Sequence, residues 1–290
     1  MSDSKSTTPN TNNKQKTSSS KQALDLAAID VLLQDRTANQ ALPGLVAGIA
    51  DSQQTLYQGA SGFSDCSSGA AMKTDTIISI ASMTKAITSA ACMQLVERGD
   101  LDLDQCIDAF FPELKQLQVL EGFNEDGSMQ LRQAASVPTL RELLTHTSGY
   151  VYEIWNANAQ KSVASGQVGS FFTDQEGFDA PLAFDPGGRF EYGIGIDWAG
   201  KLVELVSGMG LDEYMQKHIF GPLDMLDSFY QVPEDKLARK SALHMRTDEG
   251  FTVVPALGGS VSGGAGLHST VNDYLRFMRS LMNSGTLDGQ

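Results

Sequence analysis

The spacing of apolar residues separates a polar leader from an ordered remainder. Residues 1–22 are almost entirely polar, whereas leucines and isoleucines recur at helical spacing from residue 24 to residue 34. This spacing predicts an amphipathic helix. An apolar run at 45–50, a polar turn at 51–54 and a second run at 55–60 predict a β-hairpin directly after that helix.

The middle of the chain is dominated by helical patterns. A strand-like segment at 76–80 runs into a helical pattern at 83–98, and Gly99 is the expected C-cap of that helix. A short helix is predicted at 139–144, with Thr139 as its N-cap and Glu142 completing a capping box.

Later segments follow the same trend. Helices are predicted at 197–207, 211–220 and 271–282. Residues 121–136 are polar and irregular and are expected to form an exposed excursion, and residues 150–180 show no clear period. Few strands and many helices indicate an α+β architecture. We expect a disordered polar tail at 1–22 and one folded domain at 23–290.

Composition narrows the possible functions. The chain has 290 residues and a net charge of −14, which argues against a nucleic-acid partner because phosphate binding requires a surplus of lysine and arginine. No apolar run approaches the length of a membrane span, and residues 1–22 lack the apolar core of a secretory signal. Cys66, Cys92 and Cys106 form no CxxC pair and are odd in number, so a disulfide framework is not expected. The default expectation is a cytoplasmic protein that does not contact a membrane.

The candidate chemistry centres on Ser82 and Lys85. They lie three residues apart where the strand-like segment gives way to the long helix, a spacing that puts both side chains on one face. Ser82 would lie at the helix N-terminus, where free N–H groups and the dipole favour negative charge. An amine beside a hydroxyl at that position can generate a serine nucleophile without a histidine.

The spacing alone is weak support for this interpretation. Ser2/Lys5 and Ser18/Lys21 repeat it within the polar leader, which cannot build a site. The alternative is that Ser82 only caps the helix and Lys85 is a solvated residue of its first turn.

A second candidate is Tyr192, which follows a Pro-Gly-Gly turn at 186–188 and precedes a helix. A tyrosine above a serine–lysine pair can carry a proton to a leaving group. The alternative is a tyrosine packed under a loop with its hydroxyl satisfied. The glycine-rich stretch 258–266 is expected to form a tight bend rather than a phosphate loop, and His146 is expected to be structural.

Taken together, these segments resemble the serine β-lactamase superfamily, especially its class C β-lactamases and family VIII carboxylesterases. The matching segments are Ser-Met-Thr-Lys at 82–85, Thr-Leu-Arg-Glu-Leu-Leu-Thr-His-Thr-Ser-Gly at 139–149, Pro-Gly at 186–187 ahead of Tyr192, Phe-Gly-Pro-Leu-Asp-Met at 220–225, and Gly-Gly-Ala-Gly-Leu at 263–267. The resemblance implies a β-lactamase/transpeptidase-like fold, with an antiparallel sheet flanked by helices plus a helical subdomain. It also implies Ser82 as the acylated nucleophile, Lys85 as its base or proton relay, Tyr192 as the tyrosine of a Tyr-x-Asn element, and no metal or cofactor.

Two departures from the family pattern qualify these expectations. Ile194 stands where the resemblance implies an asparagine, which favours the esterase branch over β-lactam hydrolysis. Nothing after Leu267 supplies the Lys-Thr-Gly-like or Trp-Gly-Gly-like strand of the family, so we expect a partial domain with an incomplete sheet. One oxyanion donor would be the Ser82 N–H and the other would be missing. The open sheet edge would permit self-association.

The leading hypothesis is a serine hydrolase that forms an acyl-enzyme with a small-molecule ester or amide. One alternative is a catalytically impaired, truncated paralogue that acts as a binding or assembly protein. Another is a penicillin-recognising D-amino peptidase.

Overall fold

The computed structural model describes residues 25–172, 176–255 and 260–289. Its α-helices are α1 Leu26–Ala38, α2 Thr84–Arg98, α3 Leu140–Leu144, α4 Ala157–Ala164, α5 Gly195–Ser207, α6 Leu211–Met215 and α7 Val271–Met282. Its strands are β1 Gly44–Ala50, β2 Thr55–Asp65, β3 Ala70–Ala71, β4 Ile78–Ser79, β5 Gln118–Phe123, β6 Met129–Gln133, β7 Leu243–Thr247, β8 Gly250–Val254 and β9 His268–Ser269. The predicted tail at 1–22 lies outside the described residues, as do positions 258 and 259 of the glycine-rich stretch.

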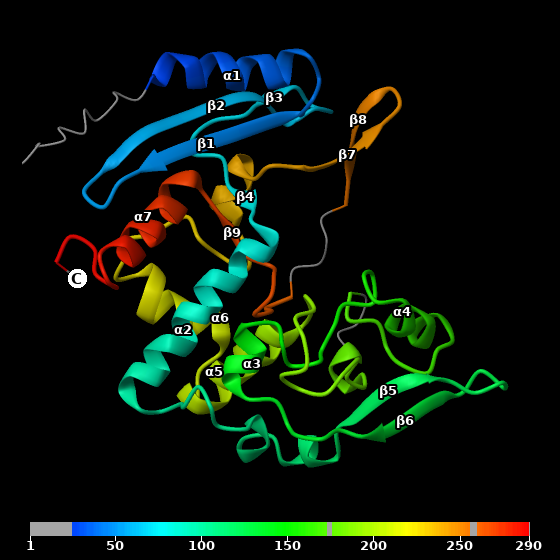
Figure 1. Ribbon diagram of the computed structural model, residues 1–290. Helices are drawn as coiled ribbons and strands as arrows, with labels where there is room; N and C mark the ends of the chain where they lie inside the picture. The colour runs from blue at the N-terminus through cyan, green and yellow to red at the C-terminus, as the bar shows by residue number, and fades with distance from the viewer. Residues whose placement is uncertain (1–24, 173–175, 256–259, 290) are drawn as a thin grey trace, which may run out of the picture.

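A three-stranded antiparallel sheet, in the order β1-β2-β3, lies between α1 and α7 (Figure 1). The predicted hairpin is confirmed: the Asp51 N–H donates to the Gln54 carbonyl at 3.0 Å and closes the turn. β2 is longer than predicted because its second half also pairs with β3. A Cβ on Gly48 would come within 2.6 Å of Val271 and 2.7 Å of Leu275, so this glycine lets α7 lie close against β1.

The helical part of the chain holds most of the core. α2 packs against α5 and α6, and its buried face includes Ile87 and Leu95. Leu202 of α5 and Tyr214 of α6 are fully buried against it. α2, α5 and α7 lie where the sequence predicts them, within two residues at each end, because the apolar residues of these helices recur at helical spacing.

The prediction for residues 121–136 is correct in that the segment is largely exposed, but wrong in that it is not irregular. This segment forms most of an antiparallel hairpin, in which β5 pairs with β6 from Gln118↔Gln133 to Phe123↔Met129. Most side chains of the two strands are exposed or half-buried, while Val119 and Leu120 are buried. The composition of the segment therefore concealed its pairing. The aperiodic region 150–180 also contains an element that was not predicted, α4, capped by the Asn156 side chain.

A short antiparallel pairing joins the segment before α2 to the segment before α7. β4 pairs with β9 through Ile78↔Ser269 and Ser79↔His268. The Ile80 N–H continues this ladder by donating to the Leu267 carbonyl at 2.9 Å. The start of α2 is thus tied to a segment more than 180 residues later in the chain.

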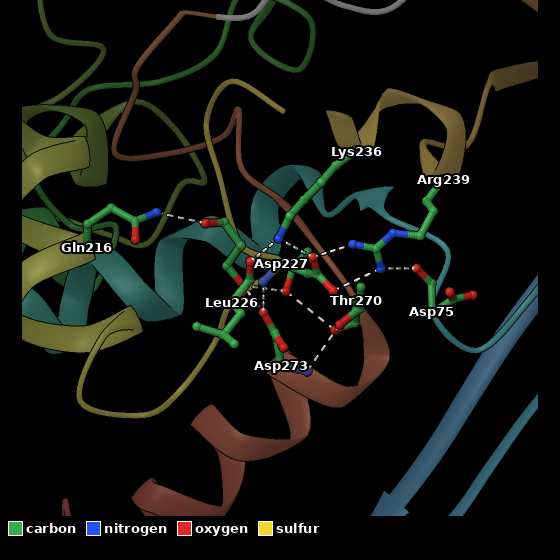
Figure 2. A network of polar contacts seen from close by, with 10 residues as sticks. Asp75, Gln216, Leu226, Asp227, Lys236, Arg239, Thr270 and Asp273 are labelled. Carbon is green, nitrogen blue, oxygen red and sulfur yellow. Dashed lines mark hydrogen bonds and ion pairs between the residues drawn. The ribbon is translucent and has the colours of Figure 1, made fainter. Parts of the chain in front are cut away.

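A half-buried carboxylate clasp, centred on Asp227, secures α7 (Figure 2). Asp227 accepts from Lys236 at 2.7 Å and forms a two-pronged ion pair with Arg239. Its backbone N–H donates to Asp273 in the first turn of α7 at 2.7 Å. Asp273 also accepts from Ser228 at 2.9 Å. The hydrogen bond from Arg239 lowers the pKa of Asp227, with help from Lys236 and against the effect of burial.

We expect Asp227→Asn to lower the free energy of unfolding at neutral pH by about 1–3 kcal/mol, since it removes charged hydrogen bonds from a half-buried pair. An aspartate with a lowered native pKa contributes stability above its unfolded pKa of about 3.9, and loses it as the pH falls through the native value. The gap between wild type and variant in urea unfolding should therefore close below about pH 4. Asp104→Asn, at the exposed pair with Arg141, is the control and should change stability much less. A gap that does not depend on pH would contradict this account.

Candidate active site

Ser82 lies in a single 3-10 turn, Ala81–Met83, that leads directly into α2. Its side chain is exposed. Ala81, immediately before it, has a φ of +44°, in the left-handed region that residues with a Cβ rarely adopt. The chain therefore accepts backbone strain to turn the serine outward at the N-terminus of a 15-residue helix.

Lys85 follows one turn later, and its side chain is only 7% exposed. Its Nζ lies 3.4 Å from Ser82 Oγ, 3.2 Å from the Tyr152 hydroxyl and 2.7 Å from the Gly264 carbonyl. The predicted juxtaposition of Ser82 and Lys85 is therefore present. The alternative of a solvated lysine does not fit this burial. Lysine is rarely buried without partners, and here three oxygens supply them.

Two tyrosines flank the lysine in different ways. Tyr152 places its hydroxyl in the hydrogen-bond network, donating to Asp197 at 3.2 Å. Tyr192 instead presents its ring, whose centroid lies 4.8 Å from Lys85 Nζ. Within the described residues the Tyr192 hydroxyl makes no hydrogen bond. The structure thus brings all three predicted residues together, but the tyrosine oxygen that contacts Lys85 belongs to Tyr152.

Burial controls the charges around this group. It raises the pKa of Tyr152, and the charge of Asp197 adds to the effect. Tyr152 therefore remains a neutral hydroxyl that donates, rather than a phenolate. Burial, followed by the charge of Lys85, lowers the pKa of His146 to about 4. The His146 ring packs 4.6 Å from that of Tyr192, and its Nδ1 accepts from the Gly193 N–H at 3.5 Å, so a neutral imidazole supports the tyrosine.

The backbone at 263–267, which lies against α2, is held by side chains of that helix. Thr88 donates to the Gly263 carbonyl at 2.7 Å, and Thr84 accepts from the Leu267 N–H at 3.3 Å. These bonds fix the backbone on both sides of Gly264. They explain why the acceptor of Lys85 can be a main-chain carbonyl rather than a side chain.

Aromatic side chains extend outward from the lysine. Trp155 packs 5.4 Å from Tyr192 and is 62% exposed, and Phe172 stacks on Tyr152 at 5.2 Å. We call these four residues the aromatic cluster. A small pocket lies beside it, lined by Tyr150, Asn156, Phe171 and other residues, but its lining includes neither Ser82 nor Lys85.

Across the described ranges, no three His, Cys, Asp or Glu side chains gather in a way that could hold a metal ion. No helix in the part of the chain that the structure describes is both long and apolar enough to cross a bilayer.

Comparison with known proteins decides the family. The beta-lactamase family model matches residues 29–290. The chain belongs to the beta-lactamase family. The α+β fold predicted from the resemblance is confirmed by this match and by solved relatives. The unliganded simvastatin synthase of Aspergillus terreus gives a TM-score of 0.80 at 31% identity, covering 89% of this chain and 68% of that one.

Curated relatives of this beta-lactamase family chain include acyltransferases and an esterase. It is 34% identical over 229 residues to monacolin J acid methylbutanoyltransferase of Aspergillus terreus, covering 75% of this chain and 55% of the relative. It is 37% identical over 227 residues to lovastatin esterase of Penicillium rubens, covering 73% and 57% respectively. The chain thus spans about half the length of the curated relatives that it matches.

Two members of the site were not predicted from the sequence. Tyr152 lies in the aromatic run just after the Thr-Ser-Gly string, and Asp197 lies in the first turn of α5. A carboxylate in an otherwise apolar helix face was a usable signal for Asp197, because such a residue is 2% exposed here and needs partners. No periodicity marked Tyr152.

Ala81→Gly provides a test of the strained turn. Glycine adopts a positive φ without penalty, and this gain offsets the usual entropy cost of about 0.4–1 kcal/mol for introducing glycine. We expect the free energy of unfolding to remain within about 0.5 kcal/mol of wild type. Ala86→Gly, at an exposed position in the first turn of α2, is the matched control and should cost about 0.5–1 kcal/mol. Equal losses in urea unfolding would show that the turn is not strained.

Proposed function

We propose that this chain transfers acyl groups through an acyl-enzyme on Ser82, to water as an esterase or to an alcohol as an acyltransferase. One observation carries the proposal: an exposed serine lies 3.4 Å from a buried lysine whose other contacts are fixed oxygens. The acyltransferase and esterase names of the relatives support it. Lys85 is proposed as the base and Tyr192 as the proton carrier to the leaving group.

The proposed chemistry balances without a metal or cofactor. The Ser82 oxygen bonds to the acyl carbon of an ester, the serine proton passes to Lys85, and the ester C–O bond breaks. The leaving alkoxide takes this proton from Lys85 through Tyr192. Water or a second alcohol then attacks the acyl-enzyme and gives its proton to Lys85. Lys85 returns that proton to the Ser82 oxygen as the acyl bond breaks, which restores the hydroxyl and the neutral amine. The dipole of α2 favours the negative charge that develops beside Ser82.

An ester is favoured over a β-lactam for a local reason. Ile194, the residue at the expected asparagine position, is 2% exposed and packs into the core ahead of α5. It offers no amide to a bound substrate. The exposed rings of the aromatic cluster instead favour an apolar acyl group or alcohol, since apolar contacts stabilise such groups as they leave water.

Ser82→Ala tests the nucleophile. We expect it to abolish labelling by a fluorophosphonate probe and turnover of p-nitrophenyl butyrate, measured with and without an added acceptor alcohol. Ser18→Ala is the matched control, because Ser18 has the same spacing to a lysine in the polar leader. Wild-type labelling in Ser82→Ala would reject the assignment. A folded wild-type chain that neither labels nor turns over would favour the non-enzymatic binding protein.

Trp155→Ala tests the apolar preference. We expect KM to rise about tenfold for p-nitrophenyl octanoate and to change little for the acetate, in keeping with the loss of an aromatic contact of roughly 0.5–1.5 kcal/mol. Phe63→Ala removes an exposed ring from β2, outside the aromatic cluster, and serves as the control. Equal effects on both esters would exclude Trp155 from the acyl-binding surface.

A further inference from the structure

Asp197 is a buried carboxylate next to the site that the proposed chemistry does not use. It lies in the first turn of α5 and is 2% exposed. Its Oδ1 accepts from the Gly264 N–H at 2.7 Å and from the Ser262 hydroxyl, and its Oδ2 accepts from the Tyr152 hydroxyl at 3.2 Å. All of these partners are neutral donors, so among the described residues Asp197 forms no direct ion pair.

Two of these donors belong to groups that in turn contact Lys85. The Gly264 peptide donates its N–H to Asp197, and its carbonyl accepts from Lys85 at 2.7 Å. Tyr152 gives its single hydroxyl proton to Asp197, so its oxygen has only lone pairs to offer Lys85 at 3.2 Å. Each oxygen of Asp197 therefore controls one acceptor of the lysine.

The position of Gly264 shows that this arrangement is closely fitted. A Cβ at Gly264 would collide with all three atoms of the Asp197 carboxylate group. Only glycine lets the peptide approach closely enough to bridge the carboxylate and the amine. Asp197 and Gly264 are therefore matched in shape as well as in hydrogen bonding.

The consequence concerns the direction of the lysine lone pair. A neutral amine has two N–H bonds and one lone pair. If both N–H bonds are taken by Gly264 and Tyr152, the lone pair is left for the third contact, Ser82. We propose that Asp197 is a positioning residue that holds both acceptors in place and thereby aims the Lys85 lone pair at the Ser82 hydroxyl. This inference rests on the proposed function of the same site.

The location of the Asp197 carboxylate relative to the Lys85 amine agrees with a positioning role. Tyr152 and Gly264 stand between the carboxylate and the amine, so Asp197 orients Lys85 without touching it. Burial raises the pKa of the Asp197 carboxyl, against the Ser262 donor, the charge of Lys85 and the donors from Gly264 and Tyr152. A carboxylate in direct contact with the amine would hold the proton that the base must give up.

Asp197→Asn is the central test because it keeps the shape and reverses one hydrogen bond. The amide oxygen can still accept from Gly264 and Ser262, but the NH₂ must donate to the Tyr152 oxygen. The Tyr152 proton is then free to bind the Lys85 lone pair. We expect kcat for p-nitrophenyl butyrate and the fluorophosphonate labelling rate to fall by about 10²-fold, with KM little changed. Tyr152→Phe added to Asp197→Asn removes the competing donor and should restore part of the labelling rate.

Asp273→Asn is the matched control. Asp273 is also buried in the first turn of a helix, and it accepts a backbone N–H and a serine hydroxyl, but it lies in the clasp of α7. It should lower the melting temperature and leave the labelling rate unchanged. Equal loss of rate in the two variants, a rise in KM alone, or wild-type rate in Asp197→Asn would overturn the positioning role. Failure of the proposed function is distinguishable, because wild type itself would then not be labelled at Ser82.

Discussion

A single amine, Lys85 Nζ, must be removed from water and still remain next to an exposed hydroxyl. Burying a lysine is costly unless its hydrogens find acceptors, and those acceptors cannot come from its own helix. Tyr152 lies 67 residues away in the chain and Gly264 lies 179 residues away. The fold around α2 therefore has to deliver two remote segments to one nitrogen atom. The other contacts of the site support this requirement.

Few charged groups act directly on the Lys85 amine. The faces of Tyr192 and Tyr152 lie 4.8 Å and 5.4 Å from Nζ and attract a cation at modest strength. His146, whose pKa is lowered to about 4, adds no second positive charge at neutral pH. The carboxylate of Asp197 is kept one hydrogen-bonding group away. The lysine is thus held mainly by geometry, an arrangement compatible with a residue that must both give up and regain a proton.

The elements that could be predicted from the sequence are those that depend on residues a few positions apart. The capping box of α3 is present with both hydrogen bonds, and Gly99 ends α2 with a φ of +80°, because both features depend on residues a few positions apart. The β5–β6 hairpin was missed because its polar residues concealed a pairing whose buried side meets distant segments. The Ser82–Lys85 contact was predictable because its two residues are also only a few positions apart in the chain. Tyr152 was not, since its role depends on Asp197, 45 residues later.

The two-residue pairing of β4 with β9 sets the precision of the site. Consecutive residues in a strand are separated by about 3.3 Å, so a slip of one residue would carry the 263–267 segment about that far along β4. A bond of 2.7 Å between Lys85 and the Gly264 carbonyl would not survive such a shift. So short a ladder cannot hold its register alone. The bonds from Thr84 and Thr88 to Leu267 and Gly263 prevent slippage from the helix side. The helix that carries the serine and the lysine therefore also fixes the segment that orients the lysine, so that nucleophile, base and acceptor move as one unit.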